Sequence, residues 1–146
     1  MIIEKLSEDM KAALKAGDKP RLGVVRMLIS ELKNARIAAG AELDEGAEQK
    51  VLASYAKKRK EAIDAARDGG RQDIAEREKF EYDVTMSYLP EQLDDEALRA
   101  LARQQVEKLG ASGPQAFGAV MKAVMAEVGG RADGKAVSAV VRELLS

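Results

Sequence analysis

The sequence predicts an all-α protein. Apolar residues recur at steps of three and four through most of the chain, which is the period of an amphipathic helix, and no segment shows the alternation of a strand. Hydrophobic residues make up 46% and charged residues 34% of the 146-residue chain, with only three prolines, a composition typical of a helical globular protein. We expect about seven helices, four before Pro90 and three after it.

The first two predicted helices are separated by Gly17 and Asp18. The first runs from about Ile3 to Lys15, and the second carries Pro20 in its first turn, where the fixed φ and missing N–H of proline are tolerated. The second helix ends near Gly40. We expect both helices to bury their apolar stripes, which are formed by Ile2, Ile3, Leu6, Met10, Ala13, Leu14, Leu22, Val25, Leu28, Ile29, Leu32 and Ala35.

This N-terminal stretch is the one mildly basic region of the chain. Met1–Gly40 holds eight basic and five acidic residues. The favoured interpretation is a solvated helix face. The alternative is a surface that follows RNA phosphates, with Arg21 and Arg26 as candidate contacts.

The third predicted helix begins at Asp44 or Glu45, and Gly69-Gly70 separates it from the fourth, which covers Arg71–Tyr88. The apolar stripe of the third helix includes Val51, Leu52, Tyr55, Ala62, Ile63 and Ala66.

The fourth predicted helix carries two carboxylates in its apolar stripe, Glu78 and Glu81. A carboxylate on an apolar face is costly unless it is paired. We therefore assign both to a structural ion pair with Arg59, Lys60 or Arg71. The alternative is a carboxylate metal site or an acid–base pair, which is disfavoured because no histidine or phosphate-binding motif accompanies it.

A domain boundary is predicted where Pro90 breaks the helical pattern and Asp94 restarts it as a helix cap. Residues 1–92 would form an N-terminal helical subdomain, and residues 93–146 a small C-terminal domain of three helices. The fifth helix ends at Gly110.

The last two predicted helices meet at a glycine corner. Gly129 and Gly130 end one helix, and Asp133 caps the next. Gly129–Lys135 spells G-x-x-x-x-G-K, but a P-loop would follow this with Ser or Thr and would begin after a strand. Because Ala136 follows and a helical period precedes, the nucleotide-binding interpretation is rejected.

The same corner is a weaker candidate for binding a phosphate. Free N–H groups at a helix start, flanked by Arg131 and Lys135, attract anions. The favoured interpretation remains a simple turn, because such caps are ordinary features of helix ends.

The residues that are absent restrict the chemistry. The chain has no cysteine, which excludes disulfides and thiolate sites, and no histidine, the usual base and metal ligand near neutral pH. We therefore assign no catalytic residue, no metal ligand and no cofactor. No apolar run is long enough to span a membrane, and the first residues do not resemble a signal peptide, so we expect a cytoplasmic location without membrane contact.

Several segments, in their order and spacing, resemble the YqeY family over essentially the whole chain. They are Gly17-Asp18-Lys19 with Arg21, Leu22 and Arg26; Gly70–Ile74 with Glu78 and Glu81; Tyr88-Leu89-Pro90; Gly118 with Val120 and Met121; and Gly130–Lys135 with Val137 and Val141.

This resemblance implies a helical N-terminal part and a C-terminal domain similar to the tail domain of the B subunit of tRNA-dependent Asp/Glu amidotransferase. That tail contacts tRNA, whereas amidation occurs elsewhere in the enzyme. The implied function is a non-catalytic, translation-associated module related to a glutamine-dependent carbon–nitrogen ligase, with tRNA, a translation-related protein or the amidotransferase as partner. Candidate RNA contacts are Lys122, Arg131, Lys135, Arg142, Arg21 and Arg26.

A protein-interaction or structural helical module without RNA contact is the alternative function. Leu93–Ser146 holds seven basic and seven acidic residues, which is far from the basic footprint of typical nucleic-acid binders.

Overall fold

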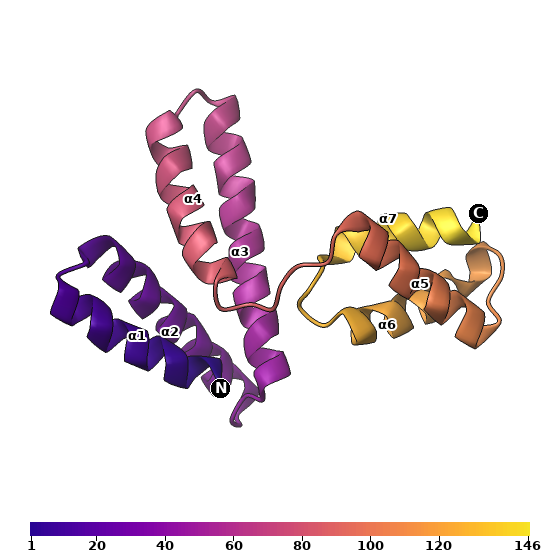
Figure 1. Cartoon of the computed structure of the whole chain (residues 1–146), viewed down its shortest axis with the longest axis horizontal. Coiled ribbons are helices and arrows are strands. Elements are labelled where there is room, and N and C mark those ends of the chain that lie inside the picture. Colours follow the sequence, from indigo (N-terminus) through magenta and orange to yellow (C-terminus); the bar gives the residue numbers. More distant parts are fainter. The chain divides into compact units, whose positions relative to one another are not determined.

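The computed structural model describes residues 1–146 and contains seven α-helices, one short 3₁₀-helix and no strand (Figure 1). The predicted all-α class is therefore confirmed. The chain divides into two compact units, Met1–Pro90 with four α-helices and Glu91–Ser146 with three.

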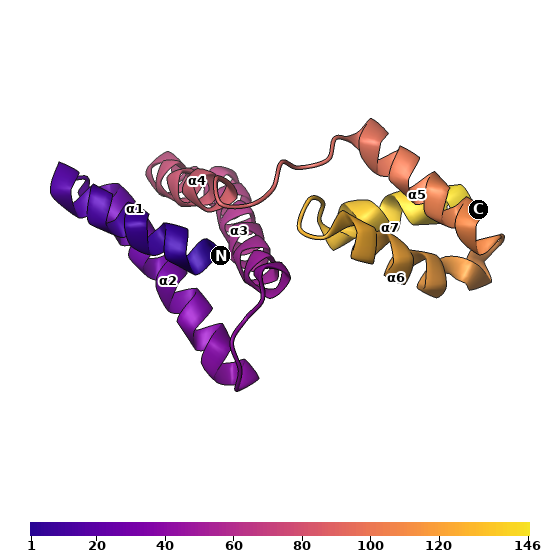
Figure 2. The ribbon, with the colours of Figure 1, turned by 60° about the horizontal axis from the view of Figure 1, so that its bottom comes forward.

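The N-terminal unit consists of two helical hairpins. Both views show α1 beside α2 and α3 beside α4 (Figures 1 and 2). The helices are α1 (Ile2–Ala16), α2 (Lys19–Ala39), α3 (Glu45–Asp68) and α4 (Gln72–Met86).

The ends of these helices follow from local chemistry. Gly17 ends α1 in the left-handed region, with φ of 69°, which glycine adopts without steric cost. Asp18 then caps α2, because its carboxylate accepts the backbone N–H of Arg21 at 3.2 Å. Asp44 caps α3 in the same way, accepting the N–H of Ala47 at 2.7 Å.

The core of the N-terminal unit lies where the two hairpins meet. Its buried residues are Ile2, Leu6, Val24, Val25, Leu28, Ile29, Leu32, Leu52, Tyr55, Val84 and Tyr88. Most of the predicted stripe is thus buried, but the prediction for Leu14 is wrong, since it is 61% exposed. The neighbouring Ala13, also in the predicted stripe, is buried, and one residue along a helix turns the side chain by about 100°, so Leu14 points to solvent.

The C-terminal unit is a three-helix bundle with its own core. It contains α5 (Asp95–Leu109), the 3₁₀-helix η1 (Pro114–Ala116), α6 (Phe117–Val128) and α7 (Gly134–Leu145). Asp94 caps α5 by accepting the N–H of Ala97 at 2.7 Å. The buried residues are Leu98, Ala102, Val120, Val124, Val128, Val137, Val140, Val141 and Leu145.

The segment before α5 is attached to the C-terminal unit. The backbone N–H of Leu93 donates to the carbonyl of Arg131 at 2.8 Å, and the side-chain amide of Gln92 donates to the carbonyl of Gly130 at 2.9 Å. These bonds explain why the division between the units falls after Pro90 rather than after Gln92. None of the helices is long and apolar enough to cross a membrane.

We predict that a glutamate-specific protease cuts the folded chain first after Glu91 or Glu42. Both residues are exposed and lie outside the helices, so the local backbone can enter a protease site without unfolding a core. Mass spectrometry of early digests identifies the cuts, and Glu91→Gln should abolish the cut between the units. Early cleavage after Glu127, which lies within α6, would contradict the described C-terminal unit.

Candidate nucleic-acid interface

The glycine corner of the C-terminal unit is a tight connection between α6 and α7. Gly129 follows the last residue of α6 with a backbone φ of 59°, a conformation that residues other than glycine rarely adopt. The carboxylate of Asp133 accepts the backbone N–H of Ala136 at 2.7 Å and so caps α7. One of the free N–H groups on which an anion site would depend is therefore already satisfied.

Arg131 is used by the fold itself. Its Nε donates to the carbonyl of Val128 at 3.1 Å, and its Nη2 donates to the carbonyl of Glu127 at 2.7 Å. These carbonyls belong to the last turn of α6, where a cation interacts favourably with the helix dipole. The Val128 carbonyl also accepts the backbone N–H of Arg131 at 3.1 Å. The guanidinium, half-buried, thus stabilises the end of α6 and is less available to a phosphate.

The other C-terminal candidates remain accessible. Lys122 on α6 and Lys135 at the start of α7 are exposed, and neither forms an ion pair. Arg142 is exposed on α7, with its guanidinium 5.5 Å from the centre of the Phe117 ring. This distance is that of a cation–π contact, which holds the guanidinium in place without neutralising it.

The two N-terminal candidates differ in their surroundings. Arg21 is half-buried near Tyr88, whose hydroxyl donates to the carboxylate of Asp9. Burial and the hydrogen bond to Asp9 raise the pKa of Tyr88 to about 12, and the charge of Arg21 acts in the opposite direction. Arg26, by contrast, is exposed and has no ion-pair partner.

Arg26 belongs to a row of unpaired cations on α2. Lys19, Arg26 and Lys33 follow one another at seven-residue intervals, and all three are exposed. Seven residues are nearly two helical turns, so the three side chains share one face over about 21 Å. We name this row the α2 basic face. The one carboxylate on the helix, that of Glu31, is half-buried, and lies about 200° from Lys33 around the helix axis.

Glu78 and Glu81 of α4 share one cation on α3. The Arg59 Nη1 lies 3.1 Å from a carboxylate oxygen of Glu78 and 3.6 Å from one of Glu81. All three side chains are partly buried. Burial and the charge of Glu78 raise the pKa of Glu81, whereas Arg59 lowers it. The cluster joins α3 to α4 across the second hairpin, a structural arrangement that leaves one carboxylate in excess.

A buried carboxylate that sequence reasoning missed lies at the start of α1. Glu48 of α3 is 2% exposed and accepts the backbone N–H groups of Ile2 at 3.1 Å and Ile3 at 2.9 Å. These N–H groups open α1 and have no partner within the helix. The sequence does indicate that Glu48 is buried, because it lies four residues before Leu52 and seven before Tyr55, on the same helix face.

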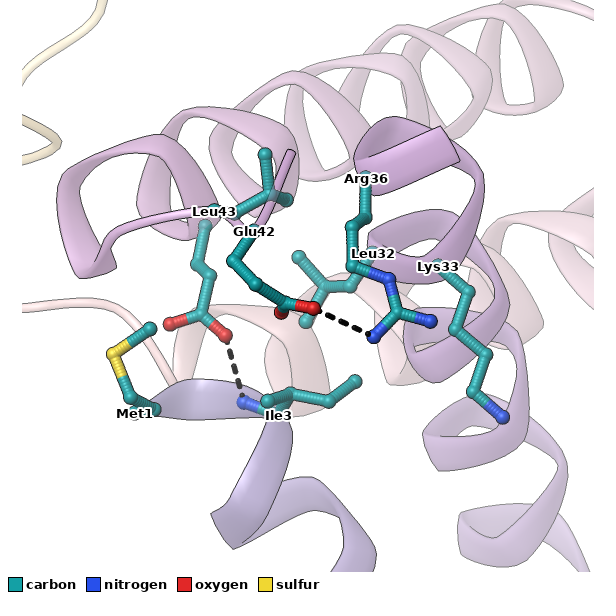
Figure 3. Close-up of a pocket in the computed structure, with 8 residues that line it drawn as sticks. Met1, Ile3, Leu32, Lys33, Arg36, Glu42 and Leu43 are labelled. Carbon is teal, nitrogen blue, oxygen red and sulfur yellow. Dashed lines mark hydrogen bonds and ion pairs between the residues drawn. The ribbon is translucent and has the colours of Figure 1, made fainter. Parts of the chain in front are cut away.

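A small cavity lies beside this carboxylate (Figure 3). Its volume is about 70 Å³, and apolar side chains from α1, α2 and the loop before α3 line it, with Lys33 at its edge. Arg36 and Glu42 form an exposed ion pair at 3.5 Å on the same side. The cavity is too small for a drug-sized ligand, since ligand pockets measure about 300 Å³ or more. We therefore assign the cavity to the packing of α1 against its neighbours.

We predict that Glu48→Ala lowers the free energy of unfolding by about 2 kcal/mol, because two helix-opening N–H groups lose a charged acceptor. Glu48→Gln retains one carbonyl acceptor and should cost about half as much. Urea denaturation measures both. Glu45→Ala, an exposed change in the same turn, is the control and should be near neutral. Equal stability of Glu48→Ala and wild type would refute the assigned contact.

We predict that Arg131→Ala costs about 1 kcal/mol of stability, because the Glu127 carbonyl loses its donor and the Val128 carbonyl keeps only the backbone N–H of residue 131. Lys135→Ala should change stability by less than about 0.5 kcal/mol, since its side chain is exposed and unpaired. Arg131→Lys keeps the charge but lacks the two separate N–H donors of the guanidinium, so it should recover little of the lost stability. Thermal denaturation of the three variants makes the comparison, and equal effects at both positions would show that Arg131 has no structural role.

Comparison with known proteins gives one family and several relatives. The family model described as "Yqey-like protein" matches residues 3–145. "Altered inheritance of mitochondria protein 41, mitochondrial" from Pyrenophora tritici-repentis (strain Pt-1C-BFP) is 27% identical over 99% of this chain and 81% of its own length. The protein of the same name from Lachancea thermotolerans is 34% identical over 60% of this chain and 47% of its own length.

These relatives correct one expectation. The cytoplasmic location expected from the sequence is wrong by this comparison, because the relatives from these two species and from Eremothecium gossypii are all named as mitochondrial proteins. The expectation rested on the lack of a membrane-spanning apolar run and on first residues that do not resemble a signal peptide. Neither feature distinguishes one aqueous compartment from another, which is why it gave the wrong location.

The resemblance expected from the short segments is confirmed, because the family match reaches from the first turn of α1 to the end of α7. The chain belongs to the YqeY family.

Proposed function

We propose that this chain is a non-catalytic helical module that binds tRNA and acts beside a translation-related enzyme, such as a glutamine-dependent amidotransferase. The α2 basic face is the observation that carries the proposal. It presents three exposed cations, Lys19, Arg26 and Lys33, without an ion-pair partner. Unpaired cations release more counterions on binding phosphate than cations already neutralised by the fold.

The composition supports backbone contacts over base recognition. Aromatic residues make up 3% of the chain, so few rings are available for stacking on unpaired bases. A row of flexible, evenly spaced cations instead suits the phosphates of a structured RNA, whose double-stranded parts are recognised mostly by shape.

The C-terminal unit would add secondary contacts. Lys122, Lys135 and Arg142 are exposed there, whereas Arg131 is held by the end of α6. The resemblance of this unit to the tail of the amidotransferase B subunit supports the choice of tRNA as the ligand.

A protein-interaction module is the second candidate, and a different observation favours it. α2 also exposes two large apolar side chains, Met27 at 47% and Ile37 at 75%. Exposed apolar groups on one helix suit a protein surface better than they suit phosphates. The two candidates differ in salt dependence, since apolar contacts are insensitive to the moderate salt that weakens phosphate contacts.

We predict that the purified chain binds tRNA with an affinity that falls as salt rises from about 50 to 200 mM. The triple variant Lys19→Ala/Arg26→Ala/Lys33→Ala should reduce the log–log salt slope by about two units, because each lost phosphate contact removes about 0.7 to 0.9. Fluorescence anisotropy with labelled tRNA measures the slope. Because the relatives are named as mitochondrial proteins, mitochondrial tRNA is tested beside bulk tRNA.

The matched control is Lys57→Ala/Lys60→Ala/Arg67→Ala, which removes three exposed cations from α3 of the same unit. This variant should keep most of the wild-type slope. If the control loses as much as the α2 variant, binding is a general charge effect and the α2 basic face has no special role. Absence of any salt-dependent tRNA affinity in the wild type would reject the RNA proposal and leave the protein-interaction candidate.

A further inference from the structure

A second, larger groove of the N-terminal unit lies between α2 and α3. Its volume is about 420 Å³, which falls within the range of small-molecule sites. Glu31 lines it from α2, and the other groove residues come from α3. They include Lys50, Ser54, Tyr55, Lys58 and Arg59.

The helix register places two lysines around a hydroxyl. Lys50, Ser54 and Lys58 follow one another at four-residue steps, so they lie along one side of α3 over about 12 Å. All three are exposed, and neither lysine is within ion-pair distance of a carboxylate. An anion that enters this groove therefore meets two unneutralised ammonium groups and an O–H donor.

The floor of the groove contains one buried donor without an acceptor, the Nε of Arg59. Tyr55 is 8% exposed beside it, and its hydroxyl is not among the fully buried unpaired atoms, so this hydroxyl reaches the open part of the groove. The Arg59 guanidinium lies 4.9 Å from the Tyr55 ring centre and engages Glu78 and Glu81 through Nη1, while its buried Nε has no acceptor. Buried polar groups are usually paired, so an unpaired buried donor at a groove favours a ligand with acceptor oxygens.

The opposite wall supplies a single acceptor. Glu31 is half-buried on α2, lines the groove and has no ion-pair partner. A simple anion would be repelled by this carboxylate. A ligand that combines anionic oxygens with a hydroxyl or amino donor would satisfy both walls, because it places its oxygens at the lysines and its donor at Glu31.

We propose that the groove between α2 and α3 binds one ribonucleotide, with the phosphate between Lys50 and Lys58 and a ribose hydroxyl or base amino group donating to Glu31. The proposal deepens the tRNA-binding function and rests on it, since the natural occupant would be an unpaired nucleotide of the bound RNA. Single-stranded loops and ends of RNA supply such unstacked nucleotides.

The test uses AMP and inorganic phosphate as probes of the full chain labelled with ¹⁵N. We expect AMP to shift the amide signals of α3 around Lys50–Arg59, and to bind at least ten-fold more tightly than phosphate. Lys50→Ala/Lys58→Ala should weaken AMP binding ten-fold or more, whereas Lys57→Ala/Lys60→Ala, which removes two exposed lysines outside the groove, should leave it unchanged. Glu31→Ala should reduce the preference for AMP over phosphate to less than three-fold.

Two outcomes overturn the proposal. If AMP and phosphate bind equally to the wild type, the groove is only a general anion site. If neither probe shifts signals at the groove, it is not a nucleotide site. Neither outcome affects the α2 basic face, whose tRNA affinity is measured separately, so the failure of this inference is distinguishable from the failure of the proposed function. Circular dichroism of each variant confirms that these surface changes leave the helices intact.

Discussion

The N-terminal unit depends on one buried carboxylate. Glu48 lies on α3 and accepts the N–H groups that open α1, so a contact between residues 46 positions apart fixes where the first hairpin meets the second. A carboxylate removed from water is stable only with such donors, which makes the two helix ends mutually dependent. The same contact fixes the position of α2 through its hairpin with α1. The α2 basic face and the groove beside α3 therefore depend on this junction.

The chain separates cations that hold the fold from cations that remain free. Arg59 binds two carboxylates of α4, Arg99 binds Asp95 and Glu143, and Arg131 binds the last carbonyls of α6. The cations of the α2 basic face have no such partners. A net charge of −1 hides this division, because it counts neutralised and free groups equally. The distribution of free charge, and not its sum, supports an RNA ligand for this family member.

Short-range patterns in the sequence predict much of the fold. The 3.6-residue period gives the seven helices, and helix caps such as Asp94 are recognisable because capping acts over three residues. Long-range contacts could not be predicted in this way. Helical periodicity shows which face of α3 is buried, but it does not identify the α1 backbone as the partner of Glu48. The use of Arg131 was missed for a related reason, since a side chain that folds back onto its own helix end leaves no periodic signal.

In the proposed function, α2 and the adjoining part of α3 form the RNA-contacting surface. Hydrogen exchange of the full chain, with and without saturating tRNA and read by mass spectrometry, tests it most directly. We expect slower exchange in peptides from Lys19–Ala39 and from the first half of Glu45–Asp68, with α4 unchanged. Protection confined to α5, α6 and α7, or no protection anywhere, would contradict it.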